Sequence, residues 1–294
     1  MTKPNLEGIT VFKVVSEPYT REDLMGMDPP LLRALLRERT HHSIECELYP
    51  ILLGRKPLPK SFGLQVELIL DVWQERGLSM DGDDFAWVME NVEAARKLRA
   101  GEKPELACDL PSPFNDQEMQ VVRKLIWERR SIRDWVANKE VPDWMIVKIL
   151  EAGRAAPTGC NLSPVRFVVI RDSKKAKMIW SDIPTPMDSC VLIVICYDER
   201  IYETVGHDKL VKHNLLLDCG AAGDHMLLMA HALGLGGVWL SCTEKTANTF
   251  QSKFGLPPYI KQCLHIAIGW TAVGSIKSKR LPLKEMVIEG PSIS

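Results

Sequence analysis

Three arginines and a serine lie within five consecutive positions near the middle of the chain, from Arg129 to Arg133. Guanidinium groups form paired, charge-assisted hydrogen bonds with phosphate oxygens, and the hydroxyl of Ser131 can add a further bond. A turn of small residues, Ala156 to Asn161, follows about 25 positions later. Its proline and glycine allow the backbone and a short polar side chain to approach a flat ligand closely. The two segments together predict a binding site for a phosphorylated planar cofactor.

The first hundred residues carry apolar side chains at helical spacing. This periodicity predicts helices over residues 30–53, 61–76 and 83–99. A proline-containing polar stretch over residues 103–114 has the composition of a linker. We therefore expect an all-helical N-terminal extension with its linker over residues 1–113, and a second domain over residues 114–294.

The second domain alternates between helical and strand patterns, which predicts an α+β fold with a sheet covered by helices. Helices are expected over residues 116–129, 142–155, 174–180, 207–233 and 243–254. Strands are expected over residues 165–170, 191–196, 236–241 and 261–268. The run 191–196 is apolar throughout, so this strand should be central and covered on both faces. The second half of helix 207–233 is mostly apolar and should be buried in the core or against another subunit.

Composition narrows the class of protein. The 294 residues are 46% hydrophobic and 26% charged, with a net charge of −1, so neither nucleic acid nor an anionic membrane is an expected partner. The longest apolar run has eight residues, Cys190 to Tyr197, against the ~20 that span a bilayer. The N-terminus lacks the apolar segment of a signal peptide, so a cytoplasmic location is expected. His41, His42, Glu45 and Cys46 are metal-ligand types, but without a second cluster no metal site is expected.

Four short motifs follow one another along the chain, and each is weak by itself. They are Arg129-x-Ser131-x-Arg133, Ala156-Pro157-Thr158-x-x-Asn161, Gly234-Leu-Gly-x-x-Trp239 and Arg280-x-Pro282. In this order and at these intervals, residues from Arg129 to about Ile288 resemble the nitroreductase-like family of FMN-dependent oxidoreductases. The resemblance implies a nitroreductase-like central mixed sheet flanked by helices. It also implies FMN as cofactor, NAD(P)H as electron donor, and a homodimer with the flavin at the subunit interface.

The resemblance also implies a set of cofactor-binding residues. They are Arg129, Arg130, Ser131, Arg133, Pro157, Thr158, Gly159, Asn161, Trp239, Leu240, Ser241, Lys279 and Arg280. By this resemblance Arg129 and Ser131 bind the phosphate and ribityl chain, and Arg280 closes on the phosphate. Arg133 lies at the N1/O2 edge of the isoalloxazine, where a fixed cation favours the reduced flavin. The segment Pro157–Asn161 reaches the flavin of the other subunit, and Trp239–Ser241 runs beneath it with a backbone N–H near N5.

The implied activity is hydride transfer from NAD(P)H through flavin N5 to a planar electron-poor acceptor, with ping-pong kinetics. A nitroaromatic, a quinone and an activated alkene all fit this description as aromatic or conjugated small-molecule substrates. Three alternatives stay open: a reductive dehalogenase or flavin-modifying member of the family, a non-catalytic electron-relay protein that docks a partner through its N-terminal helices, and an interaction protein whose arginines bind acidic partners.

Two features depart from the family pattern. Only Tyr197 to Gly206 separates the central strand from the long helix, so the usual helical lid is short or absent. We therefore expect the extension 1–113 to cover the open face of the flavin or to wrap the partner subunit; the alternative is a separate packing or interaction module. No general acid is evident, because Cys160 and the histidines of the long helix are expected to be packing or surface residues. Tyr197, Tyr202 and Cys160 are candidate proton donors only by their closeness in sequence to the predicted pocket.

Overall fold

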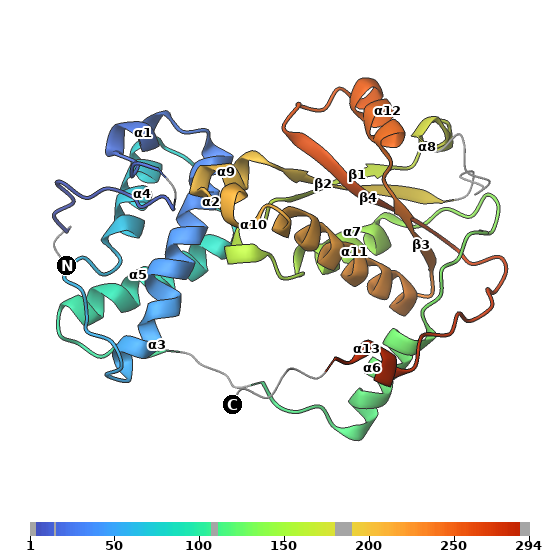
Figure 1. The fold of residues 1–294 in the computed structure, drawn as a ribbon, viewed down its shortest axis with the longest axis horizontal. Coiled ribbons are helices and arrows are strands. Elements are labelled where there is room, and N and C mark those ends of the chain that lie inside the picture. The colour runs from blue at the N-terminus through green and yellow to red at the C-terminus, as the bar shows by residue number, and fades with distance from the viewer. Residues whose placement is uncertain (1–3, 15, 107–110, 180–189, 289–294) are drawn as a thin grey trace.

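A computed structural model of the chain describes residues 4–14, 16–106, 111–179 and 190–288. Residues 107–110 of the predicted linker and Trp180, at the end of a predicted helix, lie outside these ranges. Figure 1 shows a group of N-terminal helices beside a sheet that carries helices on both faces. The predicted α+β class is confirmed.

The N-terminal extension is helical, as the periodicity predicts. Its helices are α1 (Arg21–Gly26), α2 (Pro29–Thr40), α3 (Cys46–Leu52), α4 (Leu64–Glu75) and α5 (Asp83–Arg99). The π-helical turn η1 (His41–Glu45) joins α2 to α3, so the helix predicted over 30–53 continues through a local change of hydrogen bonding. The short helix α1 was not predicted, although Thr20 and Asp23 form a capping box at its start.

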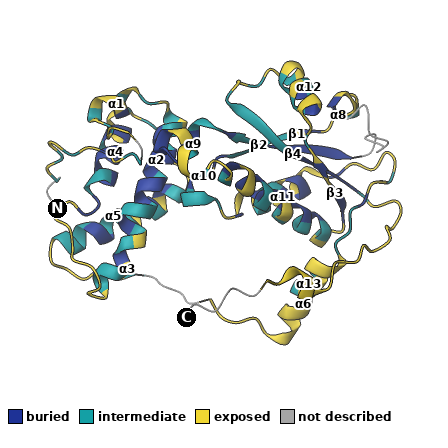
Figure 2. Ribbon diagram, in the orientation of Figure 1, coloured by how far each residue is buried: buried dark blue, intermediate teal, exposed yellow. Residues whose placement is uncertain are grey.

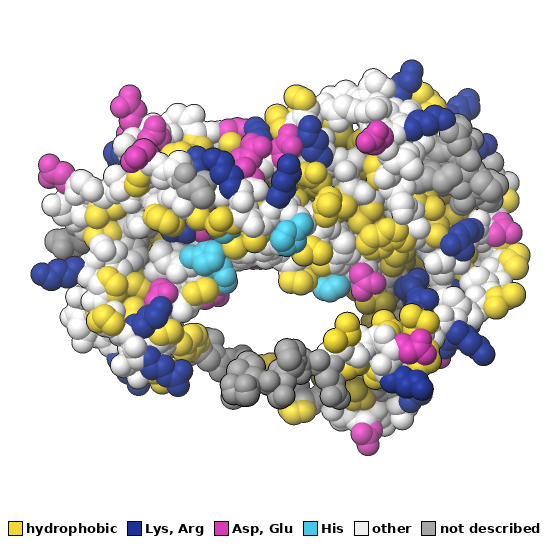
Figure 3. Space-filling model, viewed as in Figure 1, with side chains coloured by type: hydrophobic (Ala, Val, Ile, Leu, Met, Phe, Trp, Pro, Cys, Tyr) yellow, Lys and Arg dark blue, Asp and Glu magenta, His cyan; other side chains and the backbone are white. Residues whose placement is uncertain are grey.

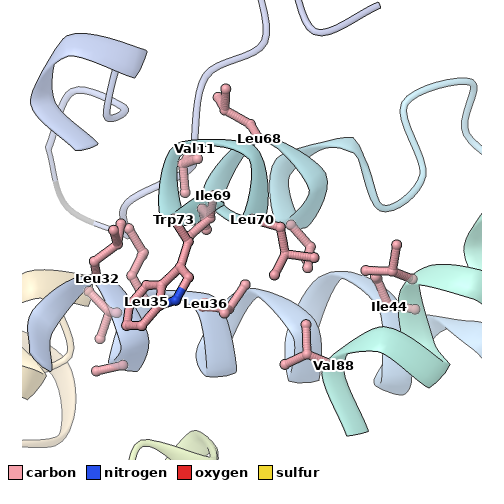
Figure 4. Close-up of a cluster of buried hydrophobic side chains, with 14 of the residues drawn as sticks. Val11, Leu32, Leu35, Leu36, Ile44, Leu68, Ile69, Leu70, Trp73 and Val88 are labelled. Carbon is pink, nitrogen blue, oxygen red and sulfur yellow. The ribbon is translucent and has the colours of Figure 1, made fainter. Parts of the chain in front are cut away.

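The extension is packed around one apolar cluster that also includes residues of the second domain. Figure 4 shows Leu35 of α2, Trp73 of α4 and Val88 of α5 pointing into this shared interior. The same cluster contains Tyr202 and Leu215, which lie far along the chain. The extension and the later helices are therefore parts of a continuous buried core.

The sheet has four strands in the order β1-β2-β4-β3, and each neighbouring pair is antiparallel. The strands are β1 (Val165–Ile170), β2 (Val191–Asp198), β3 (Gly236–Ser241) and β4 (Ile260–Gly269). Ser131 adds a parallel bridge to Gly237 of β3. The four strands pair with one another only in antiparallel fashion. Within the described residues, the parallel pairing expected of a mixed sheet occurs at this isolated bridge.

Strand β2 is central and covered on both faces, as its apolar run predicts. Successive side chains point to opposite faces of a strand. Accordingly Ile193 and Ile195 pack on one face against α7 (Asp143–Arg154) and α11 (Asn214–Ala232). Leu192 and Val194 pack on the other face in the cluster that includes α8 (Ser173–Ile179) and α12 (Glu244–Phe254).

The helix predicted over 207–233 is divided. The short helices α9 (Arg200–Val205) and α10 (Asp208–Val211) precede α11. Lys212 and His213 keep right-handed helical dihedral angles, so the hydrogen-bond ladder is interrupted while the chain direction is kept. Leu216 and Leu217 in the first turn of α11 are 52% and 61% exposed, which leaves an apolar surface at this helix. Neither α11 nor another helix of the described ranges has the length and apolar content of a membrane span.

Two helices stand away from the sheet. Figure 2 shows α6 (Asp116–Glu128) and α13 (Leu283–Met286) as largely exposed segments near each other. No residue of α6 is buried, although the helix is amphipathic. Trp127 is 58% exposed and Val121 is 67% exposed. The apolar face of α6 is thus largely exposed in the single protomer, although Val122 and Leu125 are partly buried.

Candidate functional site

The predicted arginine cluster lines a cavity of about 440 Å³. Two segments distant in sequence form its walls, one directly after α6 and the other after β4. The lining residues are Ile126, Trp127, Arg129, Arg130, Ser131, Arg133, Ser275, Ile276, Lys277, Ser278 and Arg280. Five cations and three hydroxyl groups line the cavity, and its described lining contains no carboxylate. Such a surface suits a phosphate monoester, whose charge is close to −2 at neutral pH.

Strand β3 fixes the arginine segment in place. The backbone N–H of Ile132 donates to the carbonyl oxygen of Gly237 at 3.0 Å, beside the Ser131 bridge. Trp135 donates its indole N–H to the carbonyl oxygen of Gly236 at 3.2 Å. A Cβ atom at Gly236 would lie 2.7 Å from the Cβ of Ile132, so glycine is required for this close approach. The backbone that carries these arginines is therefore held by a strand rather than forming a free loop.

The four arginines of the cavity differ in their hydrogen-bond and ion-pair partners. Arg130 donates to the carbonyl oxygens of Trp127 at 2.9 Å and Arg129 at 3.1 Å, so it caps the end of α6. Arg280 donates to the Ser278 hydroxyl oxygen at 3.1 Å. Among the described residues, no carboxylate forms an ion pair with Arg129, Arg133 or Arg280. Their positive charge is available to an anion.

Trp239, Leu240 and Ser241, which were predicted to bind the cofactor, lie on β3, the strand that also holds the arginine segment. Trp239 is 41% exposed and lies over the α11 face, where a Cβ at Gly223 would be 3.1 Å from its ring. Leu240 is buried in the cluster beneath α12, and Ser241 is exposed. These three residues do not line the arginine cavity. Lys279 is also absent from its lining, whereas Lys277, which was not predicted, belongs to it.

The predicted loop Pro157–Asn161 lies at a separate cavity of about 410 Å³. The two cavities share no lining residue. Asp218 of α11 holds the loop by accepting a hydrogen bond from the Gly159 N–H at 2.9 Å and another from the Tyr202 hydroxyl at 2.9 Å. Burial raises the pKa of Asp218, while these two hydrogen bonds oppose that rise. A Cβ at Gly159 would lie 2.3 Å from the Tyr202 hydroxyl oxygen, so only glycine fits there.

The N-terminal extension contacts the same loop directly. Arg37 donates from Nε to the backbone oxygen of Asn161 at 2.9 Å and from Nη2 to its side-chain oxygen at 2.6 Å. Pro157, Thr158 and Asn161 line the 410 Å³ cavity together with Arg37 and His41 of the extension. A larger hollow of about 910 Å³ adjoins it between α2, α5 and α7. The extension thus forms one wall of the space around the predicted flavin loop.

The chain belongs to the nitroreductase family. The family model matches residues 126–188 and 184–270. A protein of Archaeoglobus fulgidus, whose name carries the activities NADH dehydrogenase and NAD(P)H nitroreductase, is 30% identical over 157 residues, which are 52% of this chain and 86% of that protein. The NADPH-flavin oxidoreductase of Vibrio harveyi is 26% identical over 172 residues, 56% of this chain and 71% of that enzyme. The FMN reductase [NAD(P)H] of Bacillus subtilis is 27% identical over 183 residues, 56% of this chain and 71% of that enzyme.

Solved structures support the same fold. A nitroreductase-like protein of Streptococcus mutans superposes with a TM-score of 0.53 at 17% identity and covers 59% of this chain and 100% of its own. A protein of Bacteroides thetaiotaomicron with the NADH dehydrogenase/NAD(P)H nitroreductase name gives a TM-score of 0.50 at 27% identity, with 57% and 96% covered. The family model begins at residue 126, so the N-terminal helices lie outside the shared part.

Proposed function

We propose that the arginine cavity binds the phosphate of FMN and that the chain acts as an FMN-dependent NAD(P)H oxidoreductase. One observation carries this proposal: the neighbouring residues Arg129, Ser131 and Arg133 and the distant Arg280 line one cavity whose described lining holds no carboxylate. Family membership and the activities of the relatives support the same class of enzyme.

In this proposal different residues of the cavity bind different parts of the cofactor. Arg129 and Arg280 would bind phosphate oxygens, and Ser131 would donate its hydroxyl to the phosphate or ribityl chain. A charge-assisted hydrogen bond contributes roughly 1.5–3 kcal/mol, so the paired guanidiniums account for a large part of the affinity. Lys277 and Ser278 line the same cavity and complete the cationic wall.

The redox chemistry belongs to the cofactor, which when bound exchanges hydride with nicotinamide and with an electron-poor acceptor. The chain would supply binding and electrostatics. Arg133, which has no carboxylate partner among the described residues, is the cation that we assign to the N1/O2 edge, where it would stabilise negative charge. The backbone of Trp239–Ser241, next to the Gly237 bridge, would lie beneath the ring. The proposed acceptor class is a nitroaromatic, a quinone or an activated alkene.

We also propose a homodimer in which one protomer's loop Pro157–Asn161 reaches the cofactor held by its partner. In one protomer this loop lines a different cavity from the arginines. Exposed apolar side chains mark a surface that a second copy can cover. On α6 and α11 they are Met119, Val121, Ile126, Trp127, Leu216 and Leu217.

Absorbance and reduction of the purified protein test this function. A bound flavin gives a yellow protein, and anaerobic NADH or NADPH should bleach it; comparing the two donors identifies the preferred one. Steady-state turnover with a quinone then separates an enzyme from a non-catalytic electron relay, which would be reduced but would turn over negligibly. A protein that neither retains nor takes up FMN would refute the proposal.

A further inference from the structure

The sulfur of Cys160 lies between two histidines from different parts of the chain. Its Sγ is 3.2 Å from Nδ1 of His207, which follows α9. The imidazole of His42 of η1, in the N-terminal extension, also interacts with this thiol, and its ring centroid lies 6.0 Å from that of His207. Figure 3 shows histidine side chains gathered near the middle of one face, between the N-terminal helices and the sheet. The extension and the family domain each contribute one imidazole to this thiol.

A buried carboxylate lies behind both imidazoles. Nδ1 of His42 is 2.8 Å from Oε1 of Glu38, and Nε2 of His207 is 3.8 Å from the same oxygen. The Glu38 side chain is 1% exposed and also pairs with Arg39. The Glu38 carboxylate favours the protonated form of the His42 imidazole. Thiol, imidazole and carboxylate thus have the order found in activated cysteine nucleophiles.

The electrostatics favour the thiolate. Burial raises the pKa of Cys160, but the hydrogen bonds from His207 and His42 outweigh it and bring the pKa to about 6. The hydrogen bond to Cys160, followed by that to Glu38, raises the pKa of His42 to about 9. At neutral pH the pair therefore exists as thiolate and imidazolium. Cys46 differs, because burial and then Glu45 and Glu47 raise the pKa of its thiol.

The backbone around the thiol is strained and held from both sides. Cys160, Asn161 and Ser163 have φ values of 53°, 54° and 51°, which non-glycine residues rarely adopt. Asp218 holds the preceding glycine, and Arg37 holds the following asparagine. Strain that surrounding contacts maintain is characteristic of functional sites.

Cys160 opens into the 410 Å³ cavity, whose wall is polar and charged. Arg37, Arg154, His41, Glu45, Thr158 and Ser163 belong to that wall. This surface suits a small polar molecule better than a flat apolar one. We propose that Cys160 is a nucleophilic thiolate that reacts with small hydroperoxides, at a site that the extension and the family domain build together.

The proposed reaction needs only the thiolate, the hydroperoxide and a proton from His42. The thiolate attacks one oxygen of the hydroperoxide, an S–O bond forms and the O–O bond breaks. The leaving hydroxide, or the alkoxide of an alkyl hydroperoxide, takes a proton from the His42 imidazolium and departs as water or as the alcohol. Sulfur is oxidised by two electrons to the sulfenic acid, and the peroxide is reduced. This step does not require FMN, so it stands or falls separately from the proposed function.

The first test is the pH dependence of alkylation of the native protein by iodoacetamide, followed peptide by peptide with mass spectrometry. Cys46, which is exposed, serves as the control cysteine in the same molecule. Charged or titratable groups around the thiol come from every neighbouring element. They are Arg37, Glu38, Arg39, His41, His42, Glu45, Cys46, Arg154, Tyr202, His207 and Asp218. We expect half-maximal labelling of Cys160 near pH 6; a midpoint near 9 or labelling no faster than that of Cys46 overturns the proposal.

The second test uses hydrogen peroxide with dimedone to trap the sulfenic acid. We expect the trapped adduct on the Cys160 peptide, and none on that peptide in Cys160→Ser. His42→Gln should slow trapping at pH 7 by about tenfold or more, because less thiolate is present. His231→Gln, in the last turn of α11 and outside the cavity lining, is the matched control and should leave the rate unchanged. Circular dichroism verifies folding, and equal peroxide reactivity of Cys160 and Cys46 in the wild-type protein overturns the proposal without any variant.

Discussion

Arg37 of the N-terminal extension binds both the backbone oxygen and the side-chain oxygen of Asn161, at 2.9 and 2.6 Å. Asn161 belongs to the loop that the family resemblance assigns to the flavin. The loop therefore depends on a residue that the family model does not cover. The extension has at least one definite role, which is to hold this loop in a strained conformation.

Replacing Arg37 by alanine should loosen the loop. The Arg37 side chain is only 17% exposed, and hydrogen bonds from a charged donor contribute about 1.5–3 kcal/mol. We expect faster hydrogen–deuterium exchange over residues 158–163 in Arg37→Ala. Arg33→Ala is the matched control, since Arg33 pairs with Asp84 and does not contact the loop. Equal exchange in both variants would show that Arg37 does not hold the loop.

Gly159→Ala tests the close approach between the loop and α9. The added methyl group would lie 2.3 Å from the Tyr202 hydroxyl oxygen and 3.0 Å from the Asn214 amide nitrogen. Overpacking of this kind costs about 1–3 kcal/mol, and we expect that loss in the free energy of unfolding from urea titration. Gly26→Ala is the control, because a methyl group there would have no heavy atom of its surroundings within 4 Å and the φ of Gly26 is not positive. An unchanged stability of Gly159→Ala would mean that Tyr202 moves aside freely.

The sequence predicted the sheet well because its signals are local. The uninterrupted apolar run of β2 indicated a central strand, and that strand is buried on both faces. Helix 207–233 was predicted as one element because periodicity does not reveal where a hydrogen-bond ladder is interrupted. The order of the strands and the shared core of Tyr202 with the extension depend on long-range packing, which a local pattern does not encode.

The arginine cavity and the Cys160 site also differ in how far the sequence alone could predict them. Arg129, Ser131 and Arg133 are neighbours in sequence, so their residue types alone suggested an anion site, and a recurring Arg-x-Pro segment supplied Arg280. Cys160 was expected to be a packing residue. Its partners, His42 and His207, are 118 and 47 positions away along the chain. Neither the spacing nor the residue types could bring those three groups together without the fold.

Stability should decrease in mild acid because of His265. This residue is fully buried in β4, and burial lowers its pKa to about 4. Below pH 6.5 the unfolded chain binds a proton that the folded chain does not, so the free energy of unfolding falls between pH 6.5 and about 4. The loss from this residue is about 3 kcal/mol over that interval. Urea titrations at several pH values measure it.

His265→Gln should remove this part of the acid destabilisation, since glutamine does not titrate. His231→Gln, at the half-buried end of α11, is the control and should keep the full decrease. If the wild type and His265→Gln lose stability in parallel, the buried histidine is not the source.

Arg280→Ala should weaken FMN binding by about tenfold to 100-fold, which corresponds to the loss of one charge-assisted phosphate contact of about 1.5–3 kcal/mol. Fluorescence titration of the apoprotein with FMN gives the dissociation constant. Lys279→Ala provides a matched loss of charge one residue away, outside the cavity lining. Equal effects of the two substitutions would indicate general electrostatic attraction rather than a phosphate contact at Arg280.

Arg133→Ala should make the bound flavin harder to reduce. A cation at the N1/O2 edge stabilises the reduced cofactor, so its removal lowers the midpoint potential. If the interaction contributes about 1.5–3 kcal/mol, the two-electron potential should fall by roughly 30–60 mV. Anaerobic titration against a reference dye measures this, and Arg133→Lys should restore most of the potential because it keeps the charge. An unchanged potential in Arg133→Ala with FMN still bound would place Arg133 away from the ring, and it would then serve only the phosphate.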